Sequence, residues 1–123
     1  MDDGRNGLGA GFSIWDGPVP RFLQPEHRDG DTIEERFLKF HKLNPWIRDT
    51  IVSLARGFAA AGHDRVGIKM LFEVLRWQWQ LHIVDTGEQY RLNNSFTSRY
   101  ARLIAIEEPD LADMFEMRHL RAA

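Results

Sequence analysis

Apolar residues at helical spacing dominate the chain from residue 33 onwards, and this periodicity constrains the fold more than any other feature. Thr32 and Glu35 form the capping-box pattern that begins a helix: the threonine hydroxyl accepts from the third helical amide, and the glutamate reaches back. The stripe that follows consists of Ile33, Phe37 and Phe40. The spacing predicts an amphipathic helix that ends near Leu43.

Two further helices are predicted before residue 82. Asn44 and Pro45 suit a second helix start, because asparagine is a good N-cap and proline lacks only an amide that needs no partner there. Gly62 is the natural stop of this helix. Asp64 then predicts the cap of a third helix, which runs to about Leu81 and is the most apolar segment of the chain.

The periodicity changes after the third helix. Residues 89–92 predict a short strand, and Asn93 with its two polar successors predicts the cap of a fourth helix over residues 94–107. Pro109 ends this helix and opens a short helical turn, and residues 116–120 predict a strand that returns to pair with the first. The predicted fold is mainly α, a compact helical domain that is winged-helix-like, with one short two-stranded β element.

The first 30 residues differ in composition from the rest of the chain. They hold six of the ten glycines and three of the five prolines, a density that breaks helices and strands alike. Apolar residues such as Trp15 and Phe22 suit packing on the chain's own domain or on a partner. The sequence therefore predicts a Gly/Pro-rich N-terminal arm over residues 1–30 and a single helical domain over residues 31–123.

Length and composition exclude several classes of protein. A chain of 123 residues is one domain long and buries roughly two-thirds of its unfolded surface. It has no cysteine, which excludes disulfides, thiolate metal sites and thiol chemistry. No apolar run is long enough to span a membrane, and the N-terminus lacks the pattern of a secretory signal. We expect a cytoplasmic protein.

The net charge of −2 is unevenly distributed along the chain. Residues 1–35 carry a net charge of −5, residues 36–106 carry +6, and residues 107–123 carry −3. A basic middle between acidic ends is typical of a chain with an anionic partner for its middle, or of solvated helix faces that happen to be basic.

The sequence offers no set of residues for catalysis. None of the five histidines has metal-ligand spacing or a neighbouring nucleophile, and they are His27, His41, His63, His82 and His119. The acidic residues Glu107, Glu108 and Asp110 lack the alternating ligand spacing of a calcium loop. We therefore expect no enzyme activity, no cofactor and no metal.

The predicted fourth helix has the composition of a nucleic-acid recognition helix. No acidic residue lies between Arg91 and Ala105, and polar side chains gather at the start of the helix. Amides and hydroxyls bind phosphates or base edges, and guanidinium groups bind phosphates and guanine. The candidate nucleic-acid-binding residues are Asn94, Ser95, Thr97, Ser98, Arg99 and Arg102, with Lys69 and Arg76 on the preceding helix as backbone contacts. The same pattern also fits an ordinary capped amphipathic helix or a protein-binding face.

Several motifs resemble a group of small uncharacterised phage and prophage-type bacterial proteins. They are Phe40-His41-x-x-Asn44-Pro45, Gly67-Ile68-Lys69, Leu75-Arg76-Trp77, Leu92-Asn93-Asn94, Ser98-Arg99-Tyr100-Ala101-Arg102-Leu103, Pro109-Asp110-Leu111 and Phe115-Glu116-x-Arg118-x-Leu120. The resemblance covers about residues 37–120 and leaves out the arm. It implies a helical domain in a bacterial or mobile-element setting, and it implies no particular activity.

These observations predict a small, non-catalytic, winged-helix-like protein that binds nucleic acid, with duplex DNA as the expected partner, through the basic helix 94–107. The alternative is a phage-type interaction or inhibitor module that binds a host protein through its acidic ends or its apolar arm. No membrane partner is expected in either case. A homodimer fits the tryptophan-rich composition, and such dimers are usually two-fold symmetric.

Overall fold

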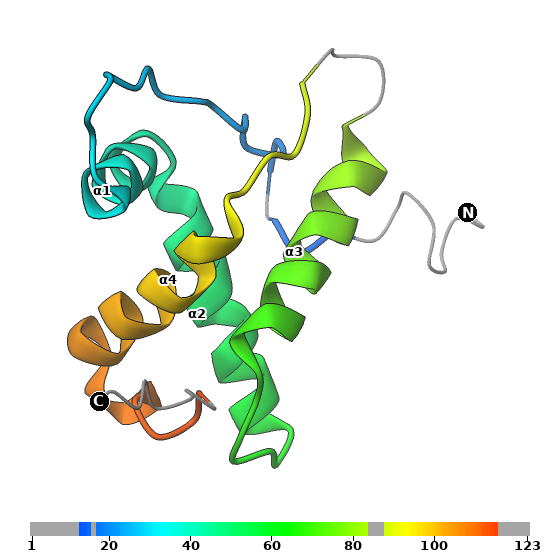
Figure 1. Ribbon diagram of the computed structural model, residues 1–123. Helices are drawn as coiled ribbons and strands as arrows, with labels where there is room; N and C mark the ends of the chain where they lie inside the picture. The colour runs from blue at the N-terminus through cyan, green and yellow to red at the C-terminus, as the bar shows by residue number, and fades with distance from the viewer. Residues whose placement is uncertain (1–12, 16, 84–87, 116–123) are drawn as a thin grey trace, which may run out of the picture.

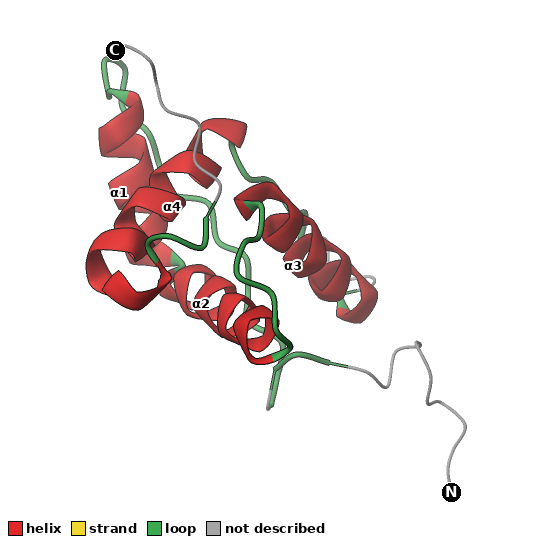
Figure 2. Ribbon diagram, turned by 90° about the horizontal axis from the view of Figure 1, so that it is seen from below, coloured by secondary structure: helices red, strands yellow, loops and turns green. Residues whose placement is uncertain are grey.

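Four α-helices fill most of residues 13–15, 17–83 and 88–115, which are the residues that the computed structural model describes (Figure 1). They are α1 (Ile33–Leu43), α2 (Pro45–Ala60), α3 (Ile68–His82) and α4 (Asn94–Glu107), and a single 3₁₀ turn, η1 (Pro109–Leu111), follows. α1 and α3 lie on opposite sides of the molecule, with α2 and α4 between them (Figures 1 and 2). The prediction of a mainly helical domain is confirmed.

The local signals place the ends of α1 and α2 correctly. The Thr32 hydroxyl accepts from the Glu35 amide at 3.1 Å, and the Glu35 carboxylate accepts from the Thr32 amide at 2.8 Å. The predicted capping box is therefore confirmed, and α1 ends at Leu43 as expected. Just beyond α2, Gly62 adopts a φ of 105°, a left-handed conformation that favours glycine at a helix end.

Two predicted helix caps are wrong. In each case a hydrogen bond to a distant segment, made by the predicted cap residue or by a residue close to it, replaces the cap. Asn44 makes no side-chain cap on α2; its carboxamide instead accepts from the Leu23 amide at 2.9 Å and donates to the Leu23 carbonyl at 2.8 Å. Asp64 lies four residues before α3, which begins at Ile68. The segment before α3 is extended because the Val66 amide donates to the Met114 carbonyl at 2.9 Å.

The predicted strand over residues 89–92 does not form a ladder in the described part of the chain. Its expected partner, residues 116–120, lies outside the described residues. The described β pairing is an isolated parallel bridge between Val66 and Phe115. Tyr90 and Leu92 instead pack their side chains on the helical core, which holds this segment extended without a neighbouring strand.

The described part of the N-terminal arm packs on the helices. Phe22 is 4% exposed, and its ring lies 4.8–6.1 Å from the ring centres of four aromatic residues: Phe40, Trp46, Trp79 and Tyr90. Trp79 also donates its indole N–H to the Pro20 carbonyl at 2.8 Å. Phe22 thus belongs to the core, so the boundary near residue 30 is a change in secondary structure and not an edge of the packed interior.

α4 and α3 supply the centre of the core. Tyr100 and Ile104 on α4 are fully buried, as are Leu71 and Leu75 on α3. The two tryptophans on α3 are two residues apart and therefore lie on nearly opposite sides of the helix, so Trp79 is buried and Trp77 is half exposed. Burial of one face of α4 in this way leaves its opposite face in solvent.

Candidate nucleic-acid interface

The exposed face of α4 carries three of the predicted site residues. Ser95, Ser98 and Arg102 are exposed, while the opposite face of the helix is buried. The Ser98 hydroxyl donates to the Ser95 carbonyl at a long 3.4 Å, and Arg102 forms no hydrogen bond or ion pair with any described residue. Asn93 caps the helix by accepting from the Ser95 amide at 2.8 Å. This face therefore presents one unneutralised guanidinium beside two small hydroxyls.

Arg99 is largely committed to contacts within the chain. Its Nε donates to the Glu34 carboxylate of α1 at 3.0 Å, and its Nη1 donates to the Ser95 carbonyl at 3.3 Å. Its side chain is 22% exposed. Arg99 thus fastens α4 to α1, and its charge is already balanced by an acid that lies far away in the sequence.

Of the two predicted cations on α3, one is paired and the other is free within the described part of the chain, as are Arg99 and Arg102, respectively, on α4. Arg76 donates to one oxygen of Glu73, one turn earlier on the same helix, through Nη2 at 2.5 Å and Nε at 3.2 Å. This carboxylate raises the pKa of Arg76 above its ordinary value. Lys69 is exposed and forms no ion pair or hydrogen bond with a described residue. Lys69 is therefore the free cation of this helix face.

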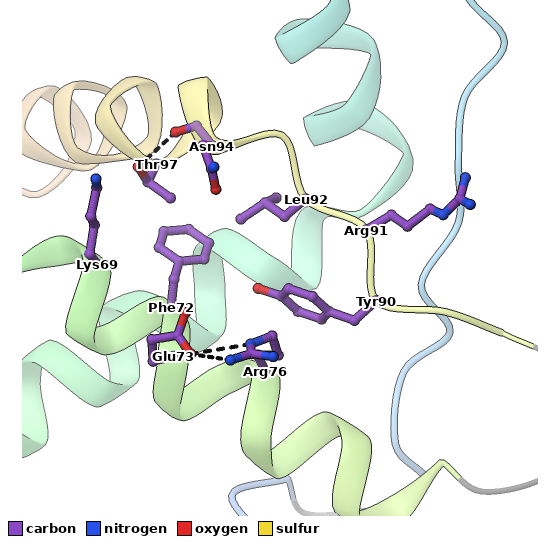
Figure 3. A pocket seen from close by; sticks show the side chains of 9 residues that line it. All are labelled: Lys69, Phe72, Glu73, Arg76, Tyr90, Arg91, Leu92, Asn94 and Thr97. Atoms are coloured by element: carbon purple, nitrogen blue, oxygen red, sulfur yellow. Dashed lines mark hydrogen bonds and ion pairs between the residues drawn. The ribbon is translucent and has the colours of Figure 1, made fainter.

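A pocket of about 400 Å³ lies between α3 and the segment that leads into α4, and it brings four predicted residues together (Figure 3). These are Lys69, Arg76, Asn94 and Thr97. The rest of its wall is formed by Phe72, Glu73, Tyr90, Arg91 and Leu92. The other four predicted residues, which all lie on α4, do not line it. The sequence therefore predicted one surface, whereas the structure has an exposed helix face and an adjacent pocket.

The side chains around this pocket have different orientations. The Lys69 amine points towards α4 near Thr97, and the Asn94 carboxamide points towards Phe72 (Figure 3). The Arg91 side chain points away from the pocket. Thr97 is buried, and its hydroxyl donates to the Asn94 carbonyl at 3.0 Å, so this hydroxyl is engaged within the chain.

Tyr90 presents a neutral hydroxyl to the pocket. The hydroxyl points towards Glu73 (Figure 3) and forms no hydrogen bond with a described residue. Burial, reinforced by the Glu73 carboxylate, raises the pKa of Tyr90 well above its ordinary value. The Tyr90 hydroxyl is therefore protonated at neutral pH and can donate a hydrogen bond. Sequence reasoning missed this residue because it was assigned to a strand.

The acidic residues at the C-terminal end of α4 and just beyond it form an ion cluster with α2 that the sequence analysis did not predict. Arg48 donates to Glu107 at 2.8 Å and to Glu108 at 2.5 Å, and Arg56 donates to Glu108 at 2.5 Å and to Asp110 at 2.6 Å. The two guanidinium groups lower the pKa of the Glu108 carboxyl, and Arg56 lowers that of the Asp110 carboxyl. The spacing of Arg48 and Arg56, two helical turns apart, was the available signal.

The described residues contain no group of three His, Asp or Glu side chains placed to hold a metal ion. Among the described residues, no helix combines the length and apolar character needed to cross a membrane.

Comparison of the chain with protein-family models, with curated proteins and with solved structures finds no match. The resemblance to phage-type proteins over residues 37–120 stays a prediction.

Proposed function

We propose that the protein binds nucleic acid through the exposed face of α4 together with Lys69 beside it. Arg102 and Lys69 contact phosphate oxygens, and the Ser98 hydroxyl exchanges its long bond to Ser95 for a phosphate contact. Contacts of this kind position a nucleic acid and carry no sequence information by themselves. Duplex DNA is the simplest partner that fits them.

The observation that carries the proposal is that the acidic side chains near α4 are paired within the described part of the chain, whereas Arg102 and Lys69 are not. The acids at the C-terminal end of α4 and just beyond it form ion pairs with Arg48 and Arg56 on α2, so they do not neutralise Arg102. Arg102 and Lys69 have no partner among the described residues. The first turn of α4 also has no acidic residue, which leaves the positive end of its helix dipole uncompensated.

The remaining predicted residues have smaller parts in this proposal. Arg99 and Arg76 would have to leave Glu34 and Glu73 before they could bind phosphate. The winged-helix-like β element stays a prediction, and the proposal does not depend on it. The connection between α3 and α4 covers residues 83–93, longer than the turn of three or four residues in a helix-turn-helix.

The protein-interaction alternative depends on features that are engaged within the chain. Phe22 of the arm is buried on the helices, and Glu108 is held between two arginines. These described parts of the arm and of the acidic C-terminal region are therefore not free docking surfaces. We infer that the basic face of α4 is the better candidate.

The test is fluorescence anisotropy with a labelled mixed-sequence duplex, titrated at several salt concentrations. Each phosphate contact contributes about 0.9 to the slope of log K against log salt concentration. We expect the double variant Lys69→Ala/Arg102→Ala to lower the magnitude of this slope by about 1.8. The matched control is Lys42→Ala/Arg65→Ala, which removes the same two types of exposed cation from outside the proposed face.

The control separates a local effect from the loss of overall charge. Absence of binding by the parent chain at low salt would contradict the proposed function. Equal loss of binding in the two double variants would contradict the proposed location, because it would show that any two cations contribute alike.

A further inference from the structure

We propose that the pocket between α3 and the segment leading into α4 binds one nucleoside monophosphate unit, with the phosphate at Lys69 and the base along the apolar floor. This inference rests in part on the proposed function, because Lys69 serves both sites. The unit is either a free mononucleotide or an unpaired nucleotide within a strand, and both sources offer the same chemistry to the pocket.

The size and shape of the pocket suit a ligand of this class. Its volume of about 400 Å³ falls within the range of small-molecule sites, which is roughly 300–1,000 Å³. One wall is a single face of α3, on which Lys69, Glu73 and Arg76 follow one another at helical spacing. The distance from Lys69 to Arg76 along the helix axis is about 10 Å, which is close to the length of a nucleoside monophosphate.

The phosphate end is defined by Lys69. Its amine has no partner among the described residues and points towards α4 near Thr97, with the Asn94 carboxamide on the same side of the pocket (Figure 3). Asn94 is exposed, and its carboxamide makes no hydrogen bond with a described residue. A cation beside a free amide donor is suited to bind a phosphate group.

The floor of the pocket is apolar. The rings of Phe72 and Tyr90 and the side chain of Leu92 lie between its two ends (Figure 3). The two rings are held in place by other aromatic residues. The ring centres of Phe72 and Tyr100 are 5.6 Å apart, and those of Tyr90 and Phe22 are 4.8 Å apart. A flat ring can lie on such a floor without moving the core, whereas a simple inorganic anion would leave it uncovered.

The far end offers both a donor and an acceptor. Arg76 uses only one oxygen of Glu73, so the second carboxylate oxygen can accept from an exocyclic amine or a sugar hydroxyl. The Tyr90 hydroxyl points towards this end and can donate to a ring nitrogen or a carbonyl (Figure 3). A nucleobase carries both kinds of partner on its edges.

The test is a titration of the full chain with adenosine 5′-monophosphate, followed by amide chemical shifts in two-dimensional NMR spectra. Inorganic phosphate and adenosine are titrated separately. We expect saturable shifts at Lys69–Arg76 and at 90–97, with tighter binding of the nucleotide than of either component. Asn94→Leu and Lys69→Ala should each weaken this binding about tenfold, the usual loss for one hydrogen bond to a charged group. Lys42→Ala should leave it unchanged.

A competition experiment distinguishes the two sources of the ligand. Displacement of a labelled single strand by adenosine 5′-monophosphate indicates that the pocket holds an unpaired nucleotide of that strand. Saturable binding of the mononucleotide without displacement indicates a free nucleotide as the ligand. Both results support the site.

Other outcomes overturn one proposal and not the other. Binding of the nucleotide no tighter than inorganic phosphate, or no loss of nucleotide binding in Asn94→Leu, overturns the pocket assignment even when the chain binds DNA. Conversely, saturable nucleotide binding by a chain that binds no DNA supports the pocket and overturns the proposed function. Asn94 and Lys69 are exposed, and neither side chain has a partner among the described residues, so their substitution leaves the fold intact.

Discussion

The two ends of α4 differ in how their charged and polar groups are used. At the C-terminal end, Glu107, Glu108 and Asp110 are paired with arginines of α2. At the N-terminal end, Lys69 and Asn94 have no side-chain partner among the described residues. A charge that is balanced within the chain stabilises the fold, whereas an unbalanced charge beside a pocket is available to a ligand. The difference separates a structural cluster from the proposed binding site, although both look alike in the sequence.

The largest expected effect comes from breaking the ion pairs at the C-terminal end of α4, which we call the structural end. Arg48→Met removes the group that holds Glu107 and Glu108, and the Arg48 side chain is only 18% exposed. We expect the free energy of unfolding to fall by about 1–2 kcal/mol, somewhat more than for an isolated surface pair. Lys69→Ala at the other end should change it by less than about 0.5 kcal/mol. Urea unfolding followed by circular dichroism measures both, and equal losses would contradict the comparison.

A second, smaller effect concerns the response of the structural end to acid. The arginines lower the pKa of Glu108 and Asp110 in the folded chain, so both groups bind protons more readily when unfolded. Their stabilisation is therefore complete well above the ordinary values of 4.5 and 3.8, and it is lost as the pH falls through the folded pKa values. Asp31 and Glu88 contribute with the same sign.

Glu108→Gln isolates the contribution of the cluster to this acid response. The variant should lose part of the pH dependence of the free energy of unfolding below about pH 5, because the glutamine does not titrate. Unfolding of the parent and the variant is measured between pH 3 and pH 7. Burial also lowers the pKa of His41 from 6.5, so the contribution of His41 to stability begins to fall at a higher pH than that of the carboxylates. An unchanged slope below pH 5 would show that the cluster is not formed in solution.

Features set by neighbouring residues could be predicted from the sequence, whereas features set by distant contacts could not. The ends of α1 and α2 were predictable because Thr32 and Gly62 act on their own neighbours. The cap expected from Asn44 was wrong because that side chain binds Leu23, 21 residues away. A strand is harder still to predict, because residues 89–92 need a partner that a single segment does not reveal.

The candidate site was predictable in composition and not in arrangement. The acid-free segment around α4 is visible in the sequence, and so is its excess of hydroxyl and amide groups. The partner of Arg99 is Glu34, 65 residues away, and the partner of Arg48 is Glu107, 59 residues away. Pairing over such distances depends on how the helices pack. For this reason the sequence could not separate the free cations from the engaged ones.

The smallest expected effect lies between the two ends of α4. Tyr100 is fully buried, and its hydroxyl has no hydrogen-bond partner in the described part of the chain. Burial raises the pKa of Tyr100, so the hydroxyl stays neutral. Its ring packs edge-on against Phe37 at 4.8 Å.

Tyr100→Phe keeps these ring contacts and removes only the unpaired polar atom. A buried polar group without a partner destabilises a protein by roughly 1–3 kcal/mol, and its removal recovers this free energy. The small cavity left by the missing oxygen is itself unfavourable and offsets part of the recovery. We therefore expect the free energy of unfolding to rise by up to about 1 kcal/mol, measured by urea unfolding against the parent chain. Tyr100→Leu, which also removes the ring, is the control and should destabilise the chain. A loss of stability in Tyr100→Phe would show that the hydroxyl has a partner in solution, and the middle of α4 would then belong with its engaged end.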